Sequence, residues 1–106
     1  MRVIAERDLG ELILTGKSRR YRDISRNGIL MKGLRRAVRI MESVETVDAL
    51  GQFSSLHYER LKYERAGYSS IRLSNSSVHR LIFEEYKDHI TLHLIEIDDT
   101  HYGNKK

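Results

Sequence analysis

The chain has 106 residues, of which 40% are hydrophobic and 32% charged, and it contains no cysteine. This length is typical of a single domain, residues 1–106, with a modest core. The absence of cysteine excludes disulfides and thiolate metal sites. The apolar runs are too short to span a bilayer, and charge within residues 1–8 comes too early for a signal peptide. We therefore expect a cytoplasmic protein with no membrane partner. The formal net charge of +4 at pH 7 favours anionic partners such as nucleic acid.

The first residues predict a short strand and a short helix. Residues 2–5 have the pattern of an apolar strand or of the lead into a helix. A helix is expected over residues 9–14, with Asp8 as its N-cap and Gly16 at its end.

Residues 17–26 are unusually basic, since half of them are lysine or arginine. Such a run is either a solvated connector or a segment that contacts phosphate. In the second case Lys17, Arg19 and Arg20 are candidate RNA contacts.

Residues 27–44 have the strongest helical pattern in the chain. One face is an apolar stripe made of Leu30, Leu34, Ala37, Val38, Met41 and Val44. The opposite face carries Lys32, Arg35, Arg36 and Arg39. The stripe is expected to pack on a sheet, and the basic face to meet solvent or an acidic partner.

The second half of the chain predicts an antiparallel meander after a helical turn at residues 46–53. The expected strands are residues 58–62, 68–74, 79–85 and 89–98. In the last strand, regular alternation places Ile97 on the face opposite Leu92 and Leu94. Helices followed by strands predict an α+β fold, with N-terminal helices packed on one face of a twisted antiparallel sheet and the other face open.

Two arginines are each flanked by apolar residues in these strands. Alternation turns Arg72 and Arg80 away from the core, and the polar residues 74–77 predict a hairpin that sets them side by side. Two adjacent guanidiniums can hold a phosphate. The alternative is that each arginine pairs with Glu84 or Glu96 across strands.

The C-terminal half also contains groups for metal-free RNA cleavage. In that reaction a base deprotonates the ribose 2′-OH, cations stabilise the phosphate, and an acid protonates the leaving oxygen. The candidate catalytic residues are Arg72, Arg80, Asp99 and His101, and further RNA contacts are Lys62, Arg65 and Tyr102. An exposed, inert His101 is the alternative. The histidines have no metal-ligand spacing and no cofactor motif is present, so we expect neither a metal nor a cofactor.

The order of these motifs resembles the HigB branch of the RelE/ParE toxin superfamily. The likeness lies in Tyr58-Glu59-Arg60-Leu61-Lys62, Gly67, Ser70-Ile71-Arg72-Leu73, Arg80-Leu81-Ile82-Phe83 and the ending Asp98-Asp99-Thr100-His101-Tyr102. The chain departs from the family pattern at Tyr63, at Thr100 and in a longer turn between Arg72 and Arg80.

The resemblance implies a RelE-like fold and the toxin of a type II toxin–antitoxin pair. It further implies a ribosome-dependent mRNA endonuclease that also contacts ribosomal RNA, with a HigA-like helix-turn-helix antitoxin as partner. In this family's pattern Lys62, Arg72 and Arg80 would contact RNA phosphate, and Asp99 and His101 would transfer protons or orient the substrate. Two alternatives stay open: a ParE-like toxin that poisons DNA gyrase, and an RNA- or partner-binding module with little activity.

Overall fold

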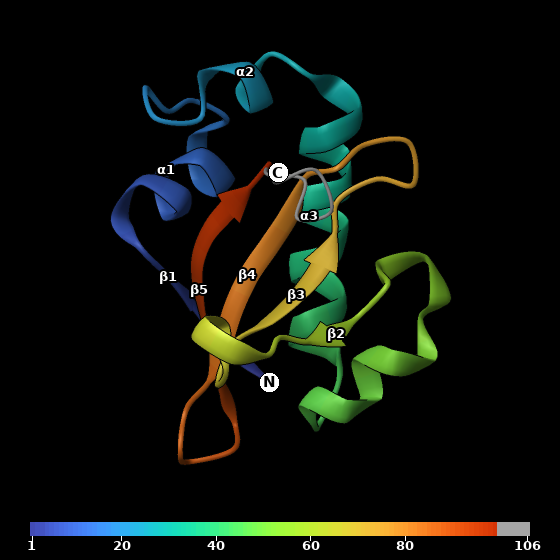
Figure 1. Cartoon of the computed structure of the whole chain (residues 1–106). Coiled ribbons are helices and arrows are strands. Elements are labelled where there is room, and N and C mark those ends of the chain that lie inside the picture. The colour runs from blue at the N-terminus through green and yellow to red at the C-terminus, as the bar shows by residue number, and fades with distance from the viewer. Residues whose placement is uncertain (100–106) are drawn as a thin grey trace.

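A five-stranded sheet with strand order β1-β5-β4-β3-β2 forms the centre of the fold (Figure 1). This computed structural model describes residues 1–99, so the predicted site residues His101 and Tyr102 lie outside the described residues. The strands are β1 (Arg2–Ala5), β2 (Glu59–Arg60), β3 (Ser69–Arg72), β4 (Arg80–Glu85) and β5 (Thr91–Asp98).

The sheet is mixed rather than antiparallel. Strands β2 to β5 form the predicted antiparallel meander, but β1 pairs with β5 in parallel. Parallel neighbours need a long connection, and the whole chain between β1 and β5 supplies it. The prediction of a purely antiparallel sheet is therefore wrong at this edge, because the predicted strand at residues 2–5 had no assigned neighbour.

The helices lie mainly on one face of this sheet (Figure 1). They are α1 (Arg7–Thr15), α2 (Arg22–Ser25) and α3 (Gly28–Ser43), with the 3₁₀ turns η1 (Val47–Gln52), η2 (Ser54–Leu56) and η3 (Tyr63–Arg65). The α+β class is thus confirmed. Within residues 1–99, none of these helices combines the length and apolar content needed to cross a membrane.

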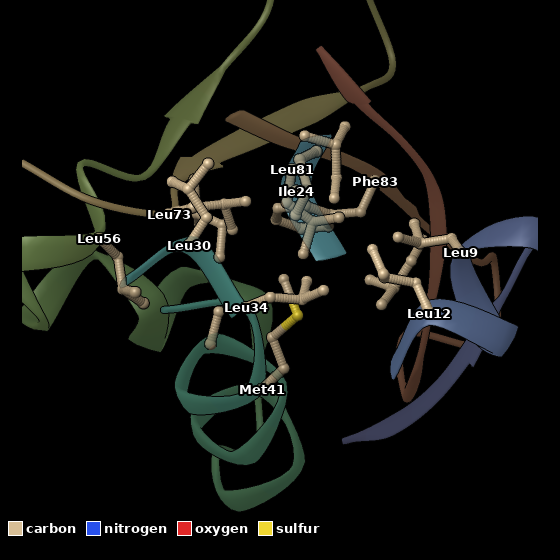
Figure 2. Packing of buried hydrophobic residues seen from close by; sticks show 14 of the residues in the cluster. Leu9, Leu12, Ile24, Leu30, Leu34, Met41, Leu56, Leu73, Leu81 and Phe83 are labelled. Atoms are coloured by element: carbon tan, nitrogen blue, oxygen red, sulfur yellow. The ribbon is translucent and has the colours of Figure 1, made fainter. Parts of the chain in front are cut away.

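Helix α3 packs its apolar stripe against the sheet, as predicted. Asn27 caps the helix, since its side-chain oxygen accepts hydrogen bonds from the backbone N–H of Ile29 and of Leu30, each at 3.1 Å. Figure 2 shows the core where this stripe meets the sheet and the other helices. The fully or nearly fully buried residues there include Leu9, Leu12, Leu30, Leu34, Met41, Leu81 and Phe83. The basic face of α3 is exposed.

Helix α1 begins earlier than predicted. Glu6 stands at the N-cap and makes no side-chain cap bond, so the prediction of Asp8 as N-cap is wrong; Asp8 lies in the first turn. The helix starts directly after β1, and Glu6 between the two elements still has an extended backbone with a ψ of 155°. Gly16 ends the helix with a φ of 78°, as predicted for a C-cap glycine.

Strand β5 contains a bulge that changes which residues face the core. Ile82 pairs with Glu96 but its neighbour Phe83 pairs with Leu94, so Ile95 is an extra residue in β5. Ile97 therefore turns to the core face with Leu94, and the prediction that these two lie on opposite faces is wrong. The acidic residues that follow the bulge, Glu96 and Asp98, point to the face away from the helices.

That outer face is partly covered, although an open face was predicted. Ser70 and Ile82 face away from the core but are 0% and 1% exposed. The turn η3 lies in front of the sheet in Figure 1, and Arg65 at its end reaches β5. A ligand of the outer face would therefore contact a surface formed by η3 as well as by the strands.

Candidate functional site

Arg72 and Arg80 are direct cross-strand partners in β3 and β4. The predicted hairpin is thereby confirmed, and the two side chains project from the same face of the sheet. The next residue across this row is Asp98 in β5. The row therefore reads Arg72, Arg80, Asp98 over three strands, which places a carboxylate on the strand next to Arg80 and reduces the repulsion between the two guanidiniums.

The alternative that these arginines pair with Glu84 or Glu96 is not what the structure shows. Glu84 contacts His93, at 3.2 Å, and Glu96 pairs with arginines of two other segments. Within the described part of the chain, no ion pair involves Arg72, which is half-buried. The catalytic role of the two arginines stays a prediction.

Glu59 is an acidic neighbour of this pair that the sequence analysis missed. Its Oε1 lies 3.7 Å from Nη1 of Arg80, and its side chain is 63% exposed. β2 places Glu59 opposite Ser70, on the same face as the arginines. The sequence could have indicated this position. Glu59 belongs to the predicted strand 58–62, and alternation along that strand, together with its pairing with β3, would place the Glu59 side chain on this face.

The carboxylate of Glu96 joins two basic segments over the same face. Its Oε1 accepts a hydrogen bond from Nη2 of Arg20 at 3.2 Å, and its Oε2 accepts one from Nη2 of Arg65 at 3.1 Å. Arg65 also lies 3.7 Å from Asp98. Two predicted RNA contacts, Arg20 and Arg65, are thus brought together from segments far apart in sequence.

A cavity of about 440 Å³ adjoins this cluster at the ends of β4 and β5. It is lined by Arg19, Arg20, Arg22, Asp23, His79 and Asp99 among others. Asp99 lies here, whereas the position beside Arg80 is occupied by Asp98, because the register after the bulge turns Asp98 toward the arginines. His79 is a further group that sequence reasoning missed, and its Nδ1 lies 2.7 Å from Oγ of Ser77.

Arg20 connects the cavity to the outer face. Besides pairing with Glu96 it lies over the ring of Tyr21, 5.0 Å from the ring centre. Tyr21 is buried, and this burial raises the pKa of its hydroxyl above the ordinary value of 10.0. The hydroxyl therefore stays protonated at neutral pH, and it accepts a hydrogen bond from the backbone N–H of Ile97.

The remaining predicted contacts within residues 1–99 are surface residues. Lys17, Arg19 and Lys62 are exposed, and Arg19 lines the cavity. Among residues 1–99, no group of three or more histidines, aspartates or glutamates has the geometry to hold a metal ion. The described groups of the cluster and the cavity include guanidiniums, carboxylates and the imidazole of His79, which can bind an anion and exchange protons.

Comparison with known proteins adds a fold relationship. No protein-family model matches the sequence. No curated protein matches it either. Among solved structures it is similar to the YoeB/ParE toxin from Agrobacterium tumefaciens, with a TM-score of 0.58 and 14% identity, covering 95% of this chain and 100% of that one. At this identity the likeness concerns the fold, and the chain has an α+β fold similar to that of a YoeB/ParE toxin.

Proposed function

We propose that this chain is the toxin of a type II toxin–antitoxin pair and acts as a HigB-like endoribonuclease. Its substrate is mRNA on the ribosome, its compartment is the cytoplasm, and a HigA-like helix-turn-helix antitoxin neutralises it. The observation that supports this proposal best is the cross-strand pair Arg72–Arg80, with the carboxylates of Glu59 and Asp98 beside it. The fold similarity to a YoeB/ParE toxin supports the toxin class.

The proposed reaction is an internal transesterification of RNA. The ribose 2′-oxygen attacks the adjacent phosphorus, the bond to the 5′-oxygen of the next nucleotide breaks, and a 2′,3′-cyclic phosphate remains. Arg72 and Arg80 bind the non-bridging oxygens, where negative charge increases in the transition state. Guanidiniums suit this task because their planar N–H groups match two phosphate oxygens at once.

Two proton transfers complete the step. Glu59 is the proposed base that accepts the 2′-OH proton, because its carboxylate is exposed and lies next to Arg80. His101 is the proposed acid that protonates the leaving 5′-oxygen, with Asp99 as its orienting neighbour, and neither metal nor cofactor takes part. The remaining RNA contacts are Lys17, Arg19, Arg20, Lys62, Arg65 and Tyr102, and the basic face of α3 meets ribosomal RNA or the antitoxin.

The test is brief induction of the protein in cells, followed by mapping of transcript 5′ ends. Wild type should arrest growth and cut mRNA within reading frames, and the double variant Arg72→Ala/Arg80→Ala should do neither while staying soluble. Arg7→Ala is the matched control, because this exposed arginine belongs to α1 in the helical layer. A soluble double variant that still cuts mRNA would overturn the site assignment.

The same experiment separates the other functions. A gyrase poison would trigger DNA-damage signalling while mRNA stays intact. A binding module would leave growth unaffected and retain salt-dependent RNA affinity. Either outcome would contradict the nuclease proposal and support the corresponding alternative function.

A further inference from the structure

We infer that Glu96 is a positioning residue, which holds Arg20 and Arg65 as a clamp for RNA phosphates next to the linkage bound by Arg72 and Arg80. The inference rests on the proposed function and extends it to the neighbouring nucleotides. The clamp is defined as Arg20, Glu96 and Arg65.

Glu96 brings together two arginines from distant segments. Arg20 belongs to the basic connector between α1 and α2, and Arg65 ends the turn η3. Each donates from Nη2 to a different oxygen of one carboxylate. A long arginine side chain on a connector loses rotamer entropy when it is fixed. Because Glu96 already holds both side chains in the free protein, less conformational entropy is lost when RNA binds.

Glu96 lies close to the proposed phosphate site. It follows the bulge in β5, two residues before Asp98 and on the same outer face, so roughly 7 Å separates it from the Arg72–Arg80–Asp98 row along the strand. The side chain of Glu96 is 28% exposed, and the side chains of Arg20 and Arg65 are 49% and 37% exposed. The clamp is therefore accessible at the row next to the proposed scissile phosphate.

A guanidinium can bind a carboxylate and a phosphate at the same time. It carries five N–H donors in a planar fork, so one arginine can donate to a carboxylate from one nitrogen and to a phosphate from another. Glu96 thus directs each arginine and leaves its positive charge in place.

Two possible roles of Glu96, positioning the arginines or repelling phosphate by its charge, predict opposite effects of Glu96→Gln on RNA affinity. Removing a negative charge beside a phosphate site should tighten RNA binding if charge alone matters. If Glu96 positions the arginines, the same substitution should weaken binding, because the amide no longer accepts two charged hydrogen bonds. The matched control is Glu84→Gln, which removes the same charge from the same face in β4. The partner of Glu84 is His93, which keeps its second contact, 2.9 Å from Glu6, so this substitution releases no arginine.

The experiment measures binding of a single-stranded oligoribonucleotide, made non-cleavable by 2′-O-methyl groups, to the full chain at several salt concentrations. For Glu96→Gln we expect about tenfold weaker binding and a salt slope reduced by about one. Glu84→Gln should bind as wild type or slightly tighter. On cleavable mRNA, Glu96→Gln should raise KM more than it lowers kcat, unlike Arg72→Ala.

A second variant distinguishes a specific loss of RNA binding from a folding defect. Arg20→Ala/Arg65→Ala should lose at least as much affinity as Glu96→Gln, and adding Glu96→Gln to it should cost nothing more, because Glu96 acts only through the two arginines. Glu96→Gln binding as tightly as Glu84→Gln, or additive losses in the triple variant, would overturn the clamp while leaving the nuclease proposal intact. Failure of wild type both to bind and to cleave RNA would overturn both.

Discussion

Gly33 of α3 lies directly against the backbone carbonyl of Leu73 at the end of β3. A Cβ on Gly33 would overlap that oxygen, and because the oxygen belongs to the backbone no side-chain movement can relieve the clash. Helix and sheet touch here through backbone atoms alone, next to the strand that carries Arg72.

We expect Gly33→Ala to destabilise the fold by about 2–3 kcal/mol, because α3 must move away from β3. Chemical unfolding followed by circular dichroism measures the difference. Gly28→Ala is the control, since a Cβ there meets nothing within 4 Å, and it should be neutral or slightly stabilising. Equal stability of Gly33→Ala and wild type would show that the helix does not approach the sheet this closely.

Arg72→Lys keeps the charge at the proposed phosphate site but removes the planar fork. Cleavage of mRNA on ribosomes should slow by about 10²-fold, because one ammonium cannot bind two phosphate oxygens in the same plane. Thermal unfolding should change little, since Arg72 makes no ion pair within residues 1–99. A lysine variant with wild-type kcat would show that charge alone is required of this residue.

Glu59→Gln tests the proposed base. The cleavage rate should fall by about 10²–10⁴-fold, which is the range for loss of a general base. Affinity for non-cleavable RNA should be kept or improved, because the lost charge lies 3.7 Å from Arg80. Parallel losses of affinity and rate would mean that Glu59 holds Arg80 in place and accepts no proton.

Asp88 makes the turn between β4 and β5 sensitive to acid. Its carboxylate accepts hydrogen bonds from the backbone N–H of Ile90 and from the backbone and hydroxyl of Thr91. The bond from Ile90 and then that from the Thr91 hydroxyl hold the pKa of Asp88 below its ordinary 3.8. A lowered folded-state pKa gives stability that is present above the unfolded-state pKa and is lost as pH falls through the folded value.

Asp88→Asn should therefore lower the unfolding temperature at neutral pH, and the gap to wild type should shrink as pH falls below about 4. Asp23→Asn is the control, because no hydrogen bond to this exposed aspartate side chain is seen in the described residues. Thermal melts at several pH values give the answer. A gap that stays constant down to about pH 2 would contradict the linkage.

Local rules were sufficient for much of the fold. The helix at residues 27–44 could be predicted because its apolar residues recur at helical spacing, and the hairpin could be predicted because residues 74–77 form a turn. These features depend on neighbours in sequence. The parallel edge strand β1 could not be predicted in the same way, since its partner lies about ninety positions away along the chain.

The site was predictable only in part, for a similar reason. Alternation correctly placed Arg72 and Arg80 on one face. The bulge at Ile95 was invisible to a period-two pattern, so the position of Asp98 beside Arg80 was not predicted. The contact of Arg20 and Arg65 with Glu96 joins three distant segments, and no local pattern contains such information.

The extra residue in β5 also bears on how this protein tolerates insertions and deletions. Without a bulge, strict alternation of the same sequence would turn Glu96 and Asp98 toward the core and Ile97 toward the arginine side. Deleting Ile95 would instead remove the bulge and leave Leu94, Ile97 and both acids on their present faces. We therefore expect a variant that lacks Ile95 to keep both carboxylates beside the arginines, in a straighter strand.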